Sequence, residues 1–460
     1  MTSSIFVRFQ YVVLLCLLYT PSIAILYMYS TTETELSSSL AGVRLVIVLL
    51  LAPIFLKYAI QLCTAPFYSL LGRMRQKRGE SPSESTVSVL IPAWNEEVGI
   101  LRTLKSVLDT QYRHLEVIII NDGSTDSTHK LVTDFVRDHE AKNYSNTIIK
   151  YLHLPNGGKA IALNQGLMLA EGEFIITIDA DSVMEKTAIT KFMKQFTDSD
   201  VAAVAGNVII GNRKTPIEVM QQLEYLYGFF FKRADSIFNS VYIIGGAAAA
   251  YRKNVLLELG GFDHKIITED IEMSTRILAH GYKTRYAADA VVYTEGPATW
   301  TGLCNQRLRW KYGRLLTFIK HRKLFFSCNK KQNIYLTFLL LPLAVYTELA
   351  LLFEAVLLTI FYGYTIYTND YLPLLILIFF VSSIIALQIA FDPMSHFHRN
   401  LLVLAPVAWL VFYIIDAVEF QALCRTLKRL LKRQDLIWQK WVRVGLPGAL
   451  QIAKKPAWEE

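Results

Sequence analysis

Two carboxylates, one residue apart, end an apolar run near the middle of the chain. The stretch Phe174-Ile-Ile-Thr-Ile-Asp-Ala-Asp-Ser182 reads as a buried strand that closes on Asp179 and Asp181. In an open parallel sheet, the ligand crevice lies beyond the carboxyl ends of the strands. Carboxylate oxygens placed there can bind a divalent cation that bridges a diphosphate. An isolated Asp-x-Asp is more often a pair of solvated carboxylates, so the surrounding residues decide between the two interpretations.

Further acidic residues lie at the edges of neighbouring predicted strands and helices, namely Glu96, Glu97, Asp122 and Asp270. Three basic residues lie among them, Lys159, Arg307 and Arg309. Asp122 can accept a hydrogen bond from an imide N–H or a hydroxyl of a nucleoside, whereas Lys159 and Arg309 can contact diphosphate oxygens. Asp270 can act as a general base if an acceptor hydroxyl lies beside it. The acidic pair at 179 and 181 is therefore accompanied by residues that can bind a nucleoside and a diphosphate.

Two features suit a sugar acceptor. Trp310 offers a flat apolar face and a polar N–H, which favour stacking on a sugar ring. The run Gly245-Gly-Ala-Ala-Ala-Ala-Tyr-Arg252 lets a ligand approach the backbone closely, so Gly245 and Gly246 are candidate acceptor contacts. Arg307 is expected at the surface or at lipid headgroups. Glu97 has a structural alternative, which is to stabilise a helix N-terminus.

Alternating strands and helices are predicted around these residues. The predicted strands are 87–91, 115–120, 147–152, the run ending at 179, and 201–209. The predicted helices are 98–109, 127–137, one opening at 159, 216–238, 268–280 and an amphipathic stretch from 299. This alternation predicts an α/β fold, a doubly wound and mostly parallel sheet with helices on both faces.

The composition places this domain beside a membrane. Hydrophobic residues make up 53% of the 460 residues, charged residues only 19%, and the net charge is +8. A mean hydropathy of +0.31 is too high for a purely soluble enzyme. The positive charge is therefore assigned to basic flanks at a lipid bilayer, and no nucleic-acid partner is expected. The five cysteines are scattered along the chain, which argues against a disulfide framework or a zinc site. They are expected to be packing residues.

Two apolar segments precede the α/β domain. Residues 11–30 are uncharged and long enough to cross a bilayer, and a cleaved signal peptide is the alternative. Residues 45–71 form a second predicted span, which a basic cluster at 73–78 follows directly. Positive flanks stay in the cytoplasm, so the domain that follows is predicted to be cytoplasmic.

Three apolar segments and a basic tail follow it. The segments are 334–367, 371–391 and 401–415, and the tail, 425–443, is predicted to be an interfacial amphipathic helix. Three complete crossings would leave the basic tail outside. Residues 401–415, with Pro406 near their middle, are therefore the first candidate for a segment that does not cross.

Taken together, the motifs resemble the processive, membrane-embedded family-two glycosyltransferases with a GT-A fold. That group includes cellulose, chitin, hyaluronan and poly-N-acetylglucosamine synthases. The matching residues are Pro92-Ala-Trp-Asn-Glu-Glu97, Asn121-Asp-Gly-Ser-Thr125, Gly158-Lys159, Asp179-Ala-Asp181, Thr268-Glu-Asp270 and Gln306-Arg-Leu-Arg-Trp310. The Gln-x-x-Arg-Trp signature is the most specific, and the resemblance covers residues 88–313.

The resemblance divides the chain into five parts. Two N-terminal transmembrane helices (1–80) precede the GT-A domain (81–298). Interfacial helices with the Gln-x-x-Arg-Trp motif (299–333), C-terminal transmembrane helices (334–424) and the basic tail (425–460) follow.

The resemblance also implies how a UDP-sugar is bound. Asp122 would contact the uridine, with Glu97 beside it, and Lys159 would reach the diphosphate. Asp181 would ligate Mg²⁺ or Mn²⁺, with Asp179 in support.

Residues later in the chain would serve the transfer itself. Asp270 would be the catalytic base. Gln306 and Arg309 would close on the diphosphate, while Trp310 would stack on the acceptor sugar at the mouth of a membrane channel.

The implied reaction is inverting transfer from a UDP-sugar to a growing polysaccharide, with the enzyme in the inner (plasma) membrane. The Ala-rich run and the layout of the spans look most like poly-β-1,6-N-acetylglucosamine synthases, which implies UDP-N-acetylglucosamine as donor. A hyaluronan-, chitin- or cellulose-type synthase is an alternative, and so is a single-transfer enzyme acting on a polyprenyl phosphate. The resemblance also admits a small membrane subunit as a partner.

Overall fold

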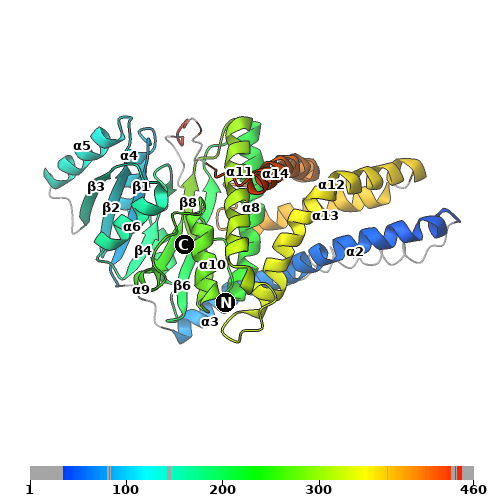
Figure 1. The fold of residues 1–460 in the computed structure, drawn as a ribbon, viewed down its shortest axis with the longest axis horizontal. Coiled ribbons are helices and arrows are strands. Elements are labelled where there is room, and N and C mark those ends of the chain that lie inside the picture. The colour runs from blue at the N-terminus through cyan, green and yellow to red at the C-terminus, as the bar shows by residue number, and fades with distance from the viewer. Residues whose placement is uncertain are drawn as a thin grey trace.

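The computed structural model describes residues 35–79, 82, 84–141, 147–369, 371–436, 441 and 443–447. Its centre is an eight-stranded mixed sheet with the strand order β3-β2-β1-β4-β7-β6-β8-β5 (Figure 1). The strands are β1 (Val87–Ala93), β2 (Leu115–Asp122), β3 (Ile148–Leu154), β4 (Phe174–Thr177), β5 (Val183–Met184), β6 (Val201–Ile210), β7 (Ala249–Arg252) and β8 (Lys283–Thr294). The predicted transmembrane segment at 11–30 lies outside the described residues.

The first four strands run parallel and therefore end at one edge of the sheet. Val87 of β1 pairs with Leu115 of β2 on one side and with Phe174 of β4 on the other. β3 continues the parallel order beyond β2. β1, β2 and β4 are buried along their whole length, which explains their continuous Val/Ile runs. Glu96 and Asp179, in the loops after β1 and β4, and Asp122, the last residue of β2, consequently meet at this edge.

Helices cover both faces, which confirms the doubly wound prediction. On one face, α4 (Ile100–Leu108), α5 (Thr128–Ala141) and α7 (Ala188–Met193) pack on Val87, Val89 and Ile91. On the other face, α6 (Lys159–Leu169), α9 (Lys253–Glu258) and α10 (Glu269–Ala279) pack on Leu90 and its neighbours. Successive residues of β1 thus serve opposite cores, because strand side chains alternate between faces.

The second half of the sheet contains three strands that the sequence analysis did not predict, β5, β7 and β8. β7 lies antiparallel between β4 and β6, and it occupies part of the small-residue run that starts at Gly245. Its Ala249 and Ala250 are fully buried, so the alanines are small because helices press on a central strand. β8 pairs parallel with β6 and has a register shift beside Gly206.

Long helices lead away from the sheet. α8 (Pro216–Ile237) and α11 (Trp300–Lys320) stand between the sheet and the helices α2 (Glu35–Thr64), α12 (Leu341–Thr368) and α13 (Leu372–Phe391) (Figure 1). Four helical stretches of the described chain are long and apolar enough to cross a membrane. They are Ala52–Arg78, Tyr335–Thr368, Leu372–Phe391 and Ala405–Leu431.

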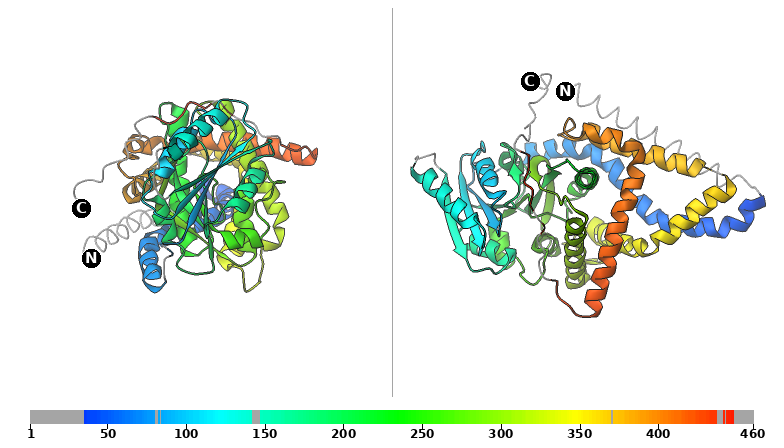
Figure 2. Two further views of the ribbon diagram at one scale, coloured as in Figure 1. Left: turned by 90° about the vertical axis from the view of Figure 1, so that its left-hand side faces the viewer. Right: turned by 90° about the horizontal axis from the view of Figure 1, so that it is seen from above.

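The fourth of these stretches lies differently from the other three. It ends in α14 (Ala408–Leu431), which lies crosswise to α2, α12 and α13 and packs on α11 (Figure 2). The helix predicted at 425–443 is present only in its first part. α14 continues through residues 425–431 and ends at Leu431, and residues 432–436, 441 and 443–447 have no helical structure. Residues 443–445 bond to the α/β domain instead.

Candidate active site

One cavity of about 1630 Å³ gathers nearly all the residues that the sequence singled out. It is lined by Asp122, Lys159, Asp179, Asp181, Gly245, Gly246, Asp270, Gln306, Arg309 and Trp310. Glu97 does not line it. Its carboxylate accepts a hydrogen bond from the Ser127 N–H (2.9 Å), just before α5 begins, and its side chain is exposed. Glu97 therefore takes the structural alternative, a helix N-terminal contact, and Glu96 lines the cavity in its place.

Lys159 is the centre of a compact charged cluster. Its ammonium lies 2.6 Å from Asp179 Oδ1 and 3.2 Å from Glu269 Oε1. Burial disfavours the charged ammonium, but Asp179, Glu269 and Asp270 outweigh this and raise the pKa of Lys159 well above its usual value. Lys159 is therefore a permanent cation at the amino end of α6, suited to bind phosphate oxygens.

The carboxylate of Asp270 is held by backbone N–H groups, one of which belongs to a glycine. Gly246 N–H donates to Asp270 Oδ2 (2.7 Å), and the N–H of Ile271 donates to Oδ1 (2.8 Å). A Cβ atom at Gly246 would lie 2.7 Å from the Lys159 ammonium and 3.5 Å from Asp270 Oδ2. At Gly245 a Cβ atom would meet nothing within 4 Å. The two glycines thus differ, since only Gly246 is in contact with the charged cluster.

Asp122 holds the loop that precedes Lys159. Its two carboxylate oxygens accept hydrogen bonds from the N–H groups of Gly157 (2.8 Å) and Gly158 (2.9 Å). Gly158 has a φ of 92°, a conformation that favours glycine. Asp122 thereby fixes the start of α6 and, through it, the position of Lys159.

The C-terminal tail reaches into the same cavity, which the sequence analysis did not foresee. We call residues 441 and 443–447 the C-terminal strap. Arg443 Nη1 lies 2.5 Å from Asp181 Oδ2, and its Nη2 lies 3.1 Å from Glu96 Oε1. The N–H groups of Val444 and Gly445 donate to Glu295 (2.7 and 3.0 Å). No local pattern indicates this contact, because the partners are far apart in the sequence.

Two residues of the Gln-x-x-Arg-Trp motif, Gln306 and Arg309, are buried. Arg309 lies over the ring of Trp441 at 5.2 Å. Its burial, together with Arg443, lowers the pKa of Arg309 to about 10, so the guanidinium stays charged at neutral pH. Gln306 is also buried, and its Oε1 has no hydrogen-bond partner among the described residues. An unsatisfied buried oxygen of this kind is a candidate ligand contact.

Arg307 is not at the surface, contrary to the prediction. Its side chain is 3% exposed and lies 2.6 Å from Glu224 of α8 and 3.6 Å from Glu419 of α14. Its guanidinium also covers the Trp310 ring at 4.3 Å. Arg307 therefore fixes Trp310 and ties α11 to two neighbouring helices.

The cavity continues from Trp310 into the long helices. Its wall there includes Leu351, Glu354, Leu357, Leu358 and Phe361 of α12, Ile376, Leu377 and Phe380 of α13, and Tyr413 and Asp416 of α14. Lys311 of α11 pairs with Glu348 (2.6 Å) and Glu419 (2.8 Å), and Arg314 also pairs with Glu348. One space thus joins the acidic cluster to the apolar helices.

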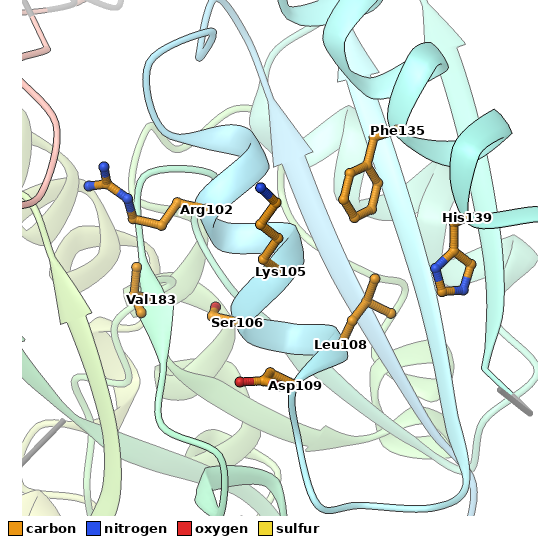
Figure 3. Close-up of a pocket in the computed structure, with 8 residues that line it drawn as sticks. All are labelled: Arg102, Lys105, Ser106, Leu108, Asp109, Phe135, His139 and Val183. Atoms are coloured by element: carbon orange, nitrogen blue, oxygen red, sulfur yellow. The ribbon is translucent and has the colours of Figure 1, made fainter. Parts of the chain in front are cut away.

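A second hollow, of about 570 Å³, lies elsewhere on the α/β domain. Its walls come from α4, α5 and β5 (Figure 3). They are formed by Arg102, Lys105, Ser106, Leu108, Asp109, Phe135, His139 and Val183. None of the predicted site residues lines it, so the larger cavity is the candidate active site.

The carboxylates of the cavity fit a divalent cation that also binds a substrate. No three His, Cys, Asp or Glu residues of the described chain are grouped to hold a metal by themselves. Asp179 and Asp181 each face a cationic side chain, Lys159 and Arg443 respectively. Mg²⁺ commonly takes only one or two carboxylates and completes its shell with waters and phosphate oxygens. Two carboxylates beside a phosphate-binding lysine match that pattern.

Comparisons with known proteins agree with this site. Residues 88–260 match the model of the Glycosyl transferase family 2. The chain is 33% identical over 240 residues to a poly-β-1,6-N-acetyl-D-glucosamine synthase of Staphylococcus epidermidis, covering 51% of this chain and 56% of the relative. It is 32% identical over 250 residues to the synthase of the same name from Staphylococcus aureus strain COL, covering 54% and 58%. The chain thus spans little more than half the length of these relatives.

A solved structure shares the fold. It is a mannosyltransferase from Pyrobaculum calidifontis in complex with GDP-Man and Mn²⁺, with a TM-score of 0.51 and 19% identity, covering 84% of this chain and all of the other. The sequence match, the mixed sheet and the acidic cavity at its edge lead to one conclusion. The chain contains a family 2 glycosyltransferase domain at residues 88–260.

Proposed function

We propose that the protein polymerises a β-linked polysaccharide from a UDP-sugar and passes the product across the membrane. The donor that we favour is UDP-N-acetylglucosamine. The observation that carries this proposal is the single cavity, which joins the acidic cluster and Trp310 to the apolar helices α12 and α13. A transferase that releases its product into water needs no such continuation. The two staphylococcal relatives, whose names specify poly-β-1,6-N-acetylglucosamine, support the sugar.

The transfer we propose is a single displacement. Asp270 takes the proton of an acceptor hydroxyl as that oxygen attacks the anomeric carbon and UDP leaves, which inverts an α-linked donor to a β product. Two backbone N–H groups orient the Asp270 carboxylate for this role. Lys159 and Arg309 stabilise the charge of the departing diphosphate. No second carboxylate is required as a nucleophile.

Donor binding involves Asp122 at the uridine, and Asp181, with Asp179 in support, would hold Mg²⁺ or Mn²⁺. The cation supplies charge neutralisation for the diphosphate leaving group. Gln306, with its unsatisfied Oε1, lines the cavity, and Arg309 lies over Trp441 of the strap, so both can close on the nucleotide. Gly245 and Trp310 form the acceptor side of the cavity.

The strap supports a topology for the membrane part. Because Arg443 contacts Asp181, the described end of the chain lies on the same side as the α/β domain. An even number of crossings must therefore separate α11 from the strap. We assign these crossings to α12 and α13, whereas α14, which lies crosswise to them, rests at the interface (Figure 2).

The variant Asp270→Asn tests the proposed chemistry. We expect at least about a 100-fold loss of transfer from UDP-N-acetylglucosamine, with UDP affinity retained, because only the base is removed. Asp289→Asn, at an exposed position of β8, is the matched control. Substantial turnover by Asp270→Asn would contradict the assigned base. Strict dependence on UDP-glucose, or on UDP-glucuronate as second donor, would favour a cellulose- or hyaluronan-type synthase.

A further inference from the structure

Lys232 is a lysine of the cavity wall that the proposed reaction does not use. It lies on α8, and its side chain lines the same cavity as Asp270 and Trp310. Its ammonium is 3.8 Å from the centre of the Phe229 ring. Within the described chain it forms no ion pair and no hydrogen bond to a carboxylate.

Two other lysines of this wall have acidic partners. Lys159 pairs with Asp179 and Glu269, and Lys311 pairs with Glu348 and Glu419. Lys232 has no equivalent, although Asp235 lies one turn further along α8.

Asp235 is already engaged elsewhere. Its Oδ1 accepts hydrogen bonds from Gln61 Nε2 (2.9 Å) and from the hydroxyl of Tyr335 (2.9 Å). No hydrogen bond or ion pair joins Lys232 to Asp235, and the Lys232 side chain lines the cavity.

An ammonium in this position is costly to keep. Burial lowers the pKa of Lys232 to about 8, even though Asp235 and Asp270 act in the opposite direction. An unpaired cation removed from water costs folding free energy, and such costs are typical of functional sites. A ligand oxygen that enters the cavity would supply the missing hydrogen-bond partner.

The donor end of the cavity has its own cations, Lys159 and Arg309. Lys232 lines the same cavity as the proposed base, Asp270, whose charge raises the pKa of Lys232. The ring of Phe229 beside it offers an apolar surface of the kind that packs on sugar rings. A neutral saccharide presents both hydroxyl oxygens and acetamide carbonyl oxygens to such a donor.

We infer that Lys232 donates a hydrogen bond to an oxygen of the acceptor saccharide and is part of its binding site. This inference rests on the proposed function, because it assumes that the acceptor is a saccharide. It adds a charged contact on α8 to an acceptor site that otherwise consists of Trp310 and the glycines of the 245–246 pair.

Binding measurements on the full chain in lipid nanodiscs test it. The probe is an oligosaccharide of β-1,6-linked N-acetylglucosamine, and UDP with Mn²⁺ is the reference ligand. For Lys232→Met we expect about a ten-fold or greater rise in the Kd of the oligosaccharide, the usual effect of losing a charged hydrogen bond. Lys232→Arg is expected to retain part of the affinity, and Lys194→Met, at an exposed lysine, is the matched control.

Three results would overturn the inference. They are unchanged oligosaccharide affinity in Lys232→Met, an equal loss of UDP affinity, and failure of the wild type to bind the oligosaccharide at all. If Lys232→Met weakened only the binding of a polyprenyl phosphate, the side chain would serve a lipid acceptor and the inference would also fail. Polymer synthesis, measured on the same preparations, distinguishes a failure of the inference about Lys232 from a failure of the proposed function. A wild type that binds the oligosaccharide through Lys232 but makes no polymer contradicts the proposed function alone.

Discussion

Gly246 shows that a residue without a side chain can be essential to a charged site. Its N–H holds Asp270, and the space where a Cβ would lie is taken by the Lys159 ammonium. We predict that Gly246→Ala displaces Lys159 and weakens UDP binding about ten-fold, because a charged contact to the diphosphate is lost. Isothermal titration with UDP and Mn²⁺ measures this directly.

Gly245→Ala is the matched control for that experiment. A methyl group there meets no protein atom within 4 Å, so UDP affinity should stay near that of the wild type. Equal losses in both variants would show that the effect is not the contact with Lys159.

Single residues differed in how well their roles could be predicted. Asp179, Asp181 and Asp270 follow predictable strand and helix ends, so the topology of the sheet brings them together. Glu97 was misplaced by one residue, since the turn after β1 directs Glu96 inward and Glu97 toward α5. Arg307 was expected at the surface because nothing in its sequence neighbourhood indicates that Glu224 and Glu419 lie beside it.

Buried carboxylates also join elements outside the cavity, and Glu272 of α10 is an example. It is fully buried and accepts hydrogen bonds from Arg276 (2.6 Å) and from Lys320 (2.6 Å) at the end of α11. His321 Nε2 lies 3.0 Å from the same carboxyl group. Burial raises its pKa, but the contacts with His321, Lys320 and Arg276 outweigh this and lower the pKa of Glu272 to about 2.

This low pKa gives a pH-dependent stability. A carboxylate whose pKa is lower in the folded state stabilises the protein above its unfolded pKa, and the contribution is lost as pH falls from about 4.5 toward 2. The shift corresponds to about 3 kcal/mol. We predict that Glu272→Gln lowers the free energy of unfolding by up to that amount at pH 7, and by clearly less at pH 3. Unfolding curves of both proteins at the two pH values measure the gap. A gap that does not change with pH would contradict this role.

The C-terminal strap gives a second prediction about an element. Arg443 occupies an oxygen of Asp181 that a cation would need, so guanidinium and metal compete for it. We expect Arg443→Gln to bind Mn²⁺ about three- to ten-fold more tightly in the absence of nucleotide, as measured by electron paramagnetic resonance. Arg137→Gln, which removes an exposed arginine, is the control. Weaker Mn²⁺ binding by Arg443→Gln would show that the strap helps to form the site.

Helices and strands with a clear apolar pattern in their own sequence could be predicted. β1, β2, α4 and α11 have periodic apolar patterns, and the structure confirms them. β7 was read only as a run of small residues, because its strand character depends on being enclosed between β4 and β6. The tail after Leu431 is basic with helical spacing, yet the described residues 443–447 are not helical, and residues 443–445 bond to Glu295, Glu96 and Asp181. Contacts over long sequence distances decided both cases.

The whole molecule raises the question of which helices cross the membrane. The sequence contains three apolar segments before a basic tail and led us to expect that one of them, first of all 401–415, does not cross. The contact of the strap with the domain favours the same even number of crossings. We predict that Gln434→Cys, in a variant without native cysteines, is protected from an impermeant maleimide in intact cells. Tyr367→Cys, at the far end of α12, should be labelled. Labelling of Gln434→Cys in intact cells would contradict this topology.

The most direct test of the proposed function is the size of its product. Membranes containing the protein are incubated with labelled UDP-N-acetylglucosamine and Mg²⁺, and the products are separated by size and by solubility in organic solvent. We predict a water-soluble or insoluble polymer with β-linkages, because the acidic cluster and the apolar helices share one cavity. The same membranes with Asp270→Asn should yield almost none. A monosaccharide attached to a lipid, as the sole product, would contradict the assignment as a polysaccharide synthase.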